Sequence, residues 1–124
     1  MARSSLQLKT TGLDHVVLHV KDVSVSKQFY VELLGMEVEH ENPGRVFLSC
    51  GQQRVAFFER ERSGSKAAGH DLNHLALQIE SGSTKEVKAA LEQRGIEVSG
   101  RKGDPNCIYF HDPDGHQLQI LTPR

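Results

Sequence analysis

Residues 13–20 read LDHVVLHV and residues 72–79 read LNHLALQI, so that one stretch returns 59 positions later in the chain. Every position of the two copies is identical or chemically close. Apolar residues recur at every second position, which is the period of a β-strand with one buried face. A repeat at a fixed offset indicates a chain built from two copies of one structural unit.

A polar junction and then a helical pattern follow each copy, at residues 24–34 in the first half and 83–94 in the second. Each pattern ends in a glycine, Gly35 or Gly95. Glycine is suited to the left-handed conformation that closes many helices. The two halves therefore agree beyond the repeated strand.

Three further strands are predicted after each helix, with turns at residues 51–52 and 112–115. These strands are predicted at 36–40, 45–50 and 53–59, and again at 96–99, 107–111 and 117–122. The order β-α-β-β-β occurs twice. It predicts an α+β fold in which two βαβββ modules form cupped mixed sheets around a central cavity.

The chain length of 124 residues fits one domain, with module one at 12–60, a linker at 61–70 and module two at 71–122. Fifteen Lys and Arg balance sixteen Asp and Glu, so no overall basic field recruits nucleic acid or an anionic membrane. No long apolar run or signal peptide is evident, and Cys50 and Cys107 lack the CxxC spacing of a zinc knuckle. We therefore expect a cytoplasmic protein whose partner is a small molecule.

Alternation along the first strand of each module places His15 and His74 on the face turned away from the helix. A single histidine on a strand more often packs and hydrogen-bonds than binds a metal. The same residue at the same place in both modules favours a shared metal site. Aligning residues 54–57 with 117–120 gives Ala56 and Gln119 the matching place on the last strands. Ala56 cannot bind a metal, whereas Gln119 can do so through its side-chain carbonyl but cannot act as a base.

The remaining histidines are expected to be less central. His19 shares the face of His15 and is a second candidate for the cavity wall. His111 and His116 flank the turn at 112–115 and are expected to be exposed, and His40 and His70 to lie on the surface. Arg54 and Phe58 share the face of Ala56 and could meet a ligand, although an arginine at a strand end is often merely solvated.

The repeated strands, the FYVELLGMEV helix end and the CIYFHDPDGHQLQI ending together resemble the vicinal oxygen chelate superfamily. This superfamily includes glyoxalase I, fosfomycin-resistance thiol transferases, extradiol dioxygenases and bleomycin-binding proteins. The resemblance spans residues 12–122 and implies a homodimer with a divalent metal, such as Mn, Fe, Zn or Ni. It implies His15, His74 and Gln119 as metal ligands and Tyr109 as a substrate-facing catalytic residue. Gln119 departs from the family, which commonly has a glutamate there.

Two functions from different classes remain open. The first is an enzyme, a metal-dependent lyase, thiol transferase or dioxygenase, in which the metal acts as a Lewis acid on adjacent oxygens. The loss of the glutamate disfavours isomerase and epimerase chemistry and affects a thiol transferase least, because its nucleophile comes with the co-substrate. The second is a metal-free, bleomycin-resistance-like protein that sequesters a ligand, which Ala56 and Gln119 favour.

Overall fold

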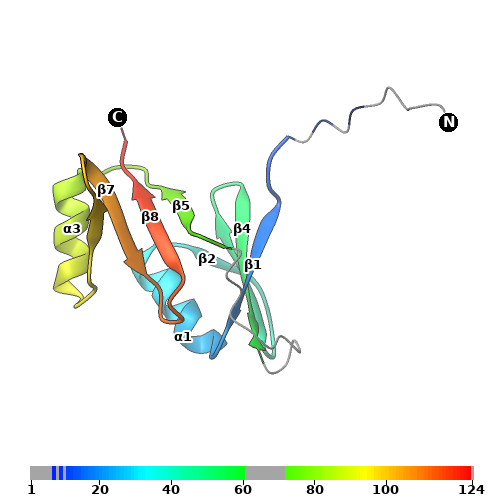
Figure 1. Cartoon of the computed structure of the whole chain (residues 1–124). Helices are drawn as coiled ribbons and strands as arrows, with labels where there is room; N and C mark the ends of the chain where they lie inside the picture. Colours follow the sequence, from blue (N-terminus) through cyan, green and yellow to red (C-terminus); the bar gives the residue numbers. More distant parts are fainter. Residues whose placement is uncertain (1–6, 8, 10, 61–71, 124) are drawn as a thin grey trace.

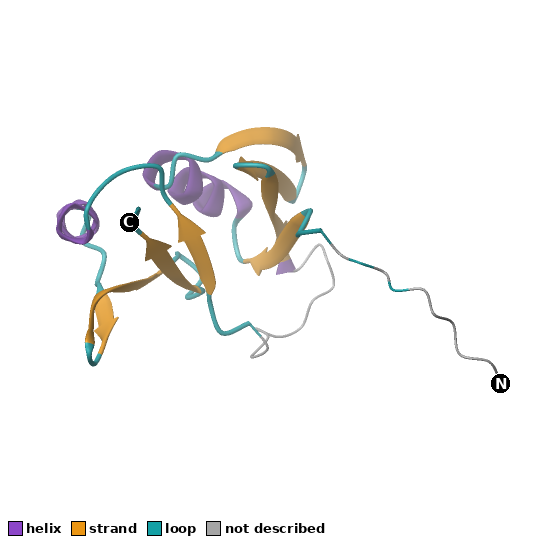
Figure 2. Ribbon diagram, turned by 90° about the horizontal axis from the view of Figure 1, so that it is seen from above, coloured by secondary structure: helices purple, strands orange, loops and turns teal. Residues whose placement is uncertain are grey.

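The structure is a computed structural model that describes residues 7, 9, 11–60 and 72–123. The predicted linker at 61–70, which includes His70, lies outside the described residues. Two separate sheets of four strands each dominate the chain, with the helices packed beside them (Figures 1 and 2). The predicted α+β class and the repeated β-α-β-β-β order are confirmed.

The first sheet has the strand order β1-β4-β3-β2, with β1 parallel to β4 and the other neighbours antiparallel. Its module consists of β1 (His15–Val20), α1 (Val23–Gln28), η1 (Phe29–Leu33), β2 (Glu37–Asn42), β3 (Arg45–Cys50) and β4 (Gln53–Glu59). The second sheet repeats the pattern as β5-β8-β7-β6, with β5 parallel to β8. Its module consists of β5 (Leu75–Gln78), α3 (Thr84–Gln93), β6 (Ser99–Arg101), β7 (Asp104–His111) and β8 (Gln117–Leu121).

Helices α1 and α3 begin at side-chain caps, and the predicted glycines follow the ends of η1 and α3. The Asp22 carboxylate accepts a hydrogen bond from the backbone N–H of Ser24 at the start of α1. Ser83 and Glu86 form a reciprocal capping box at the start of α3. Gly35 and Gly95 have φ angles of 69° and 73°, in the left-handed region where a side chain would be strained.

Three elements differ clearly from the sequence prediction, and one of them is β7, which begins at Asp104 and not at 107. The helix expected at 24–34 is α-helical only as far as Gln28 and then continues as a π-helical turn, η1. The strand expected at 96–99 begins later, at Ser99. Its delay has a local cause, because the backbone N–H of Ile96 is still bonded to the carbonyl of Leu91 in the closing turn of α3.

One hydrophobic core joins the two modules. Tyr30 and Phe57 of the first module and Phe110 of the second are fully buried members of the same cluster. The rings of Phe29 and Phe110 meet across the modules, with centroids 6.5 Å apart. Figure 2 shows the α1–η1 helix lying between the two sheets, and Phe29, which makes this contact, belongs to η1.

The turn at residues 112–115 carries a buried polar contact that also joins the modules, and the expected exposure of His116 is wrong. The side chain of Asp112 accepts hydrogen bonds from the Tyr30 hydroxyl and from His116 Nδ1, each 2.7 Å long. His116 was expected to be exposed, yet only 19% of its side chain is accessible, because it turns inward to this carboxylate. His111 and His40 are exposed, as expected.

Asp114 of the same turn binds the first module as well. It accepts hydrogen bonds from the backbone N–H of Lys21 and the hydroxyl of Ser26, and it lies 3.6 Å from the Arg60 guanidinium.

Among the described residues, no helix has both the length and the apolar character needed to cross a membrane.

Candidate functional site

Each sheet has one face toward the core and one open face. On β1 the side chains of Leu18 and Val20 are buried in the core, whereas His15 and Val17 lie exposed on the other face, as alternation predicted. The register pairs His15 with Arg54 and Val17 with Ala56. In the second sheet, Ala76 pairs with Gln119. Ala56 and Gln119 therefore occupy equivalent places in the two modules, as the sequence alignment predicted.

On the first sheet, His15 is the end of a chain of polar contacts. Its Nδ1 lies 2.8 Å from Asp14 Oδ2, and its ring meets that of Phe47 edge-on at 5.9 Å. The other oxygen of Asp14 accepts a 3.2 Å hydrogen bond from Arg54, whose Nε donates to Glu39 at 2.6 Å. A shallow pocket of about 290 Å³ lies over this group, lined also by His40.

These contacts set the charges on the first open face. The hydrogen bond from His15 and the positive charge of Arg54 hold the pKa of Asp14 below its usual value. Glu39 and Asp14 in turn raise the pKa of Arg54. Asp14 and Arg54 are therefore both charged at neutral pH. Arg54, which could have been merely solvated, is paired with the carboxyl groups of Asp14 and Glu39.

On the second sheet, His74 lies next to the proposed catalytic tyrosine. His74 Nδ1 lies 2.8 Å from Asn73 Oδ1, and its ring meets that of Tyr109 edge-on at 5.6 Å. Tyr109 pairs in register with Gln119 on the neighbouring strand. The Tyr109 hydroxyl accepts a 2.6 Å hydrogen bond from the Arg101 guanidinium, which also lies against the ring.

The amide of Gln119 lies near a cysteine. Its Nε2 is 4.0 Å from the sulfur of Cys107, a free thiol that is buried, and its Oε1 is an oxygen of the kind that can bind a metal or a ligand. Gln119 and Cys107 also line a broad groove of about 1210 Å³ that extends along the second sheet to Ser83 and Lys85 at the start of α3.

The structure brings His74, Tyr109 and Gln119 together on one open face, and it places His15 on the other sheet. His15 also borders a cleft of about 430 Å³ together with Ala76 and Gln78 of β5, but the lining of that cleft includes neither His74 nor Gln119. Within the described parts of the chain, no three His, Cys, Asp or Glu side chains form a group able to hold a metal ion.

The individual donors nevertheless suit a divalent metal. An oxygen of the preceding residue engages Nδ1 of each histidine, which leaves Nε2 free, and Gln119 offers a carbonyl oxygen. Imidazole nitrogen is a common ligand of Zn, Fe, Mn and Ni, and an oriented second nitrogen is the usual arrangement around such a ligand. The residue types therefore suit a divalent metal. Because His15 lies on the other sheet of this chain, a site with all three residues needs His15 from a second copy of the chain.

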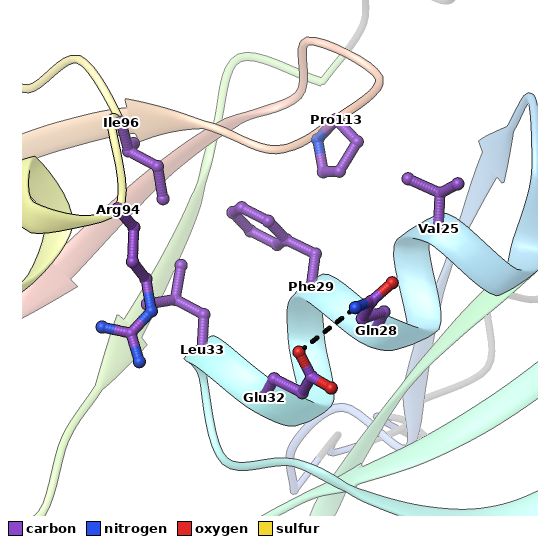
Figure 3. Close-up of a pocket in the computed structure, with 8 residues that line it drawn as sticks. All are labelled: Val25, Gln28, Phe29, Glu32, Leu33, Arg94, Ile96 and Pro113. Atoms are coloured by element: carbon purple, nitrogen blue, oxygen red, sulfur yellow. Dashed lines mark hydrogen bonds between the residues drawn. The ribbon is translucent and has the colours of Figure 1, made fainter.

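Another pocket, of about 310 Å³, lies on the helix side between the modules (Figure 3). Its lining is mostly apolar, with the Phe29 ring toward its centre and Glu32 and Arg94 at its edge. Glu32 accepts a 3.3 Å hydrogen bond from Gln28. With no histidine, cysteine or tyrosine in its lining, this pocket offers none of the chemistry found on the open faces.

The comparison with known proteins agrees with the fold. Residues 12–120 match the Glyoxalase/Bleomycin resistance protein/Dioxygenase superfamily, and the chain belongs to this family. It is 29% identical over 111 residues to glutathione transferase FosA of Serratia marcescens, covering 88% of this chain and 79% of the relative. It is 24% identical over 119 residues to metallothiol transferase FosB of Staphylococcus epidermidis, covering 93% and 84%.

A solved structure supports the architecture. The fosfomycin resistance protein FosX of Listeria monocytogenes superimposes with a TM-score of 0.76 over 94% of each chain, at 22% sequence identity. At this identity the likeness concerns the fold. The resemblance to the vicinal oxygen chelate superfamily is thus confirmed by the family match and by the shared architecture.

Sequence reasoning did not find several residues that shape the site. Asp14 and Asn73 hold the two histidines, and Arg101 contacts the Tyr109 hydroxyl. A sequence signal existed for the first two, because a residue with a side-chain oxygen precedes the histidine in both copies of the repeat. No such signal pointed to Arg101, since its partner follows after a turn and lies on the adjacent strand.

Proposed function

We propose that the protein is a divalent-metal-dependent enzyme that transfers a thiol to a small, oxygen-rich acceptor. The observation that carries this proposal is the grouping of His74, Tyr109 and Gln119 on one open face, with His74 held through Nδ1. The relatives named as glutathione and metallothiol transferases support the reaction class.

The proposed metal ligands are Nε2 of His15, Nε2 of His74 and Oε1 of Gln119. Because His15 lies on a different sheet from the other two, we propose that each site combines His15 of one protomer with His74 and Gln119 of its partner in a homodimer. Mn, Fe, Zn and Ni all suit two imidazoles and an amide oxygen. When bound, such a metal supplies Lewis acidity to adjacent oxygens of the acceptor.

The side chains of the chain itself favour thiol transfer over proton abstraction. Gln119 is uncharged and cannot remove a proton, unlike a glutamate at this place. The Tyr109 hydroxyl, beside the fixed charge of Arg101, is suited to donate a hydrogen bond to an acceptor oxygen as negative charge develops there. The thiol sulfur bonds to a carbon of the acceptor, a carbon–oxygen bond breaks, and the released oxygen takes up the thiol proton.

The broad groove beside Gln119 offers room for the thiol. It measures about 1210 Å³ and is lined by polar and apolar residues in similar measure, including Asn106 and Lys85. A thiol molecule of peptide size fits a groove of these dimensions. With its two free cysteines, the protein also suits the reducing cytoplasm, where we propose that it acts.

The alternative, a metal-free protein that sequesters a ligand, predicts a different outcome in the same assay. Protein loaded with Mn²⁺ or Zn²⁺ is incubated with glutathione or cysteine and with fosfomycin as the first acceptor, and adducts are followed by mass spectrometry. We expect an adduct whose formation needs the metal and is lost in His74→Ala. Stoichiometric binding of the acceptor by chelator-treated protein, with no metal bound by untreated protein, would favour sequestration instead.

The homodimer is tested separately by light scattering. The chain has a mass of 13.8 kDa, and we expect twice this mass in solution at micromolar concentration. A mass equal to one chain would contradict a site shared between protomers.

A further inference from the structure

We propose that Asp14 and Asn73 are matched positioning residues, each fixing the tautomer and orientation of the histidine that follows it so that Nε2 faces the open side of the sheet. This inference rests on the proposed metal site, and it concerns residues outside the proposed ligand set.

The geometry is the same in both modules. The distance from His15 Nδ1 to Asp14 Oδ2 is 2.8 Å, and so is the distance from His74 Nδ1 to Asn73 Oδ1. The pair recurs because the repeat places a short side chain with an oxygen immediately before each histidine. Equal contacts at equivalent places, made by different residues, indicate a shared role.

The chemistry of the acceptors decides which nitrogen carries the proton. A carboxylate oxygen only accepts hydrogen bonds, so His15 Nδ1 must be the protonated nitrogen. The structure turns the amide oxygen of Asn73, which is also an acceptor, toward His74 Nδ1, and this orientation corresponds to the same tautomer. In each ring the lone pair is therefore on Nε2, on the side away from the backbone contact. An unconstrained neutral imidazole prefers the opposite tautomer, with the proton on Nε2.

Asp14 is itself held, whereas Asn73 has no equivalent support from the last strand. Asp14 Oδ1 accepts a hydrogen bond from Arg54, whose Nε is bonded to Glu39. In the second module, Gln117 occupies the place of Arg54 and brings no charge. The relay Glu39–Arg54–Asp14 therefore fixes His15 more firmly than Asn73 alone fixes His74.

The ring nitrogens report the tautomer directly. Long-range ¹H–¹⁵N spectra of the metal-free protein at about pH 8.5, where an ordinary imidazole is neutral, distinguish protonated from unprotonated nitrogens. We expect His15 and His74 to carry the proton on Nδ1. Asp14→Ala should move the His15 proton to Nε2 and leave His74 unchanged, and Asn73→Ala should do the reverse.

Conservative variants separate positioning from charge. Asp14→Asn removes the charge but keeps an acceptor oxygen, and Asn73→Asp adds a charge and can only accept, so both should retain the wild-type tautomers. Calorimetric titration with Mn²⁺ and Zn²⁺ should give a loss of about 10- to 100-fold in affinity for each alanine variant, with most of it restored in Asp14→Asn. Asp14 and Asn73 are exposed, so these variants should fold, which circular dichroism checks.

The tautomers and the metal affinity test different claims. Protons on Nε2 in the wild type, or tautomers unchanged in both alanine variants, would overturn the positioning role even if metal binds. A wild-type protein that binds neither Mn²⁺ nor Zn²⁺ would overturn the proposed function, whereas the tautomers of the metal-free protein would still support or overturn the role of Asp14 and Asn73.

Discussion

The phenol of Tyr30, in the helix of the first module, donates a 2.7 Å hydrogen bond to the carboxylate of Asp112, in the last turn of the second. The Tyr30 side chain is fully buried, and Asp112 is 5% exposed. Burial and then the negative charge of Asp112 raise the pKa of Tyr30, so that the phenol stays protonated and remains the donor. This contact connects residues that are 82 positions apart and ties the two modules together.

Removing this hydrogen bond should lower the stability of the whole chain. Tyr30→Phe leaves a buried carboxylate with one partner fewer, and we expect a loss of about 1–3 kcal/mol in the free energy of unfolding. Urea denaturation followed by circular dichroism measures it. The other tyrosine gives the control, because Tyr109→Phe removes a hydroxyl from the open face and should change stability by less than about 0.5 kcal/mol. Equal effects of the two substitutions would mean that the Tyr30 contact does not join the modules.

Asp112 should make stability depend on pH in the acid range. Burial acts to raise the pKa of Asp112, but the hydrogen bonds from His116 and Tyr30 outweigh it and hold the pKa below its usual value. The unfolded chain therefore binds the proton first as the pH falls. The stability contributed by Asp112 is present above the unfolded pKa of about 3.9 and is lost as the pH falls through the lower pKa of the folded state.

The measurement compares wild type with Asp112→Asn. The difference in unfolding free energy should be largest near neutral pH and should shrink below about pH 4. A difference that is constant between neutral and acid pH would show that the charge of Asp112 contributes nothing to the fold.

Much of the fold could be predicted from local pattern. Alternation along residues 13–20 and 72–79 identified the first strands and the side on which His15 lies, and Gly35 and Gly95 marked the helix ends. The π-helical turn could not be predicted, because the spacing of apolar residues along the sequence does not distinguish an α-helical turn from a π-helical one. The inward turn of His116 was missed for another reason, since its partner Asp112 is buried only when the other module packs against it.

The site could be predicted only in part. The alignment of residues 54–57 with 117–120 gave Gln119 the place that Ala56 has in the first module, whereas its pairing with Tyr109 on the face of His74 came only from the structure. Whether His15 comes close to His74 and Gln119 depends on how two modules pair. The sequence pattern within one module does not determine this pairing. The supporting contacts of Asp14 and Arg101 depend on side-chain conformation and become evident only in three dimensions.

Tyr109 should affect catalysis and not metal binding. If its hydroxyl donates to the developing charge on the acceptor, Tyr109→Phe should lower kcat/KM of thiol transfer about 100-fold. Calorimetric titration of Mn²⁺ into the same variant should give the wild-type affinity. Tyr30→Phe, assayed at a temperature where it is folded, should retain wild-type transfer. A parallel fall in metal affinity would instead assign Tyr109 to the metal site.

Restoring a carboxylate at position 119 should strengthen the metal site. Gln119→Glu places a negative charge beside the cation, which at an effective dielectric near 20 is worth several kcal/mol before desolvation. Even with most of that gain cancelled, affinity for Mn²⁺ or Zn²⁺ should rise more than about tenfold. A binding protein would respond differently, since the unpaired charge would destabilise the fold and leave metal affinity unchanged.

The central claim, a metal site shared between two protomers, is tested most directly by mixing two defective chains. His15→Ala and His74→Ala homodimers each lose one ligand from both sites and should bind Mn²⁺ or Zn²⁺ only weakly. The mixed dimer, made by co-expression with two different tags, combines the intact His15 of one chain with the intact His74 of the other at a single site. We predict one tightly bound metal for each mixed dimer, measured by elemental analysis and titration, and recovery of thiol transfer at that site. A mixed dimer that binds metal as weakly as either parent would contradict the shared site.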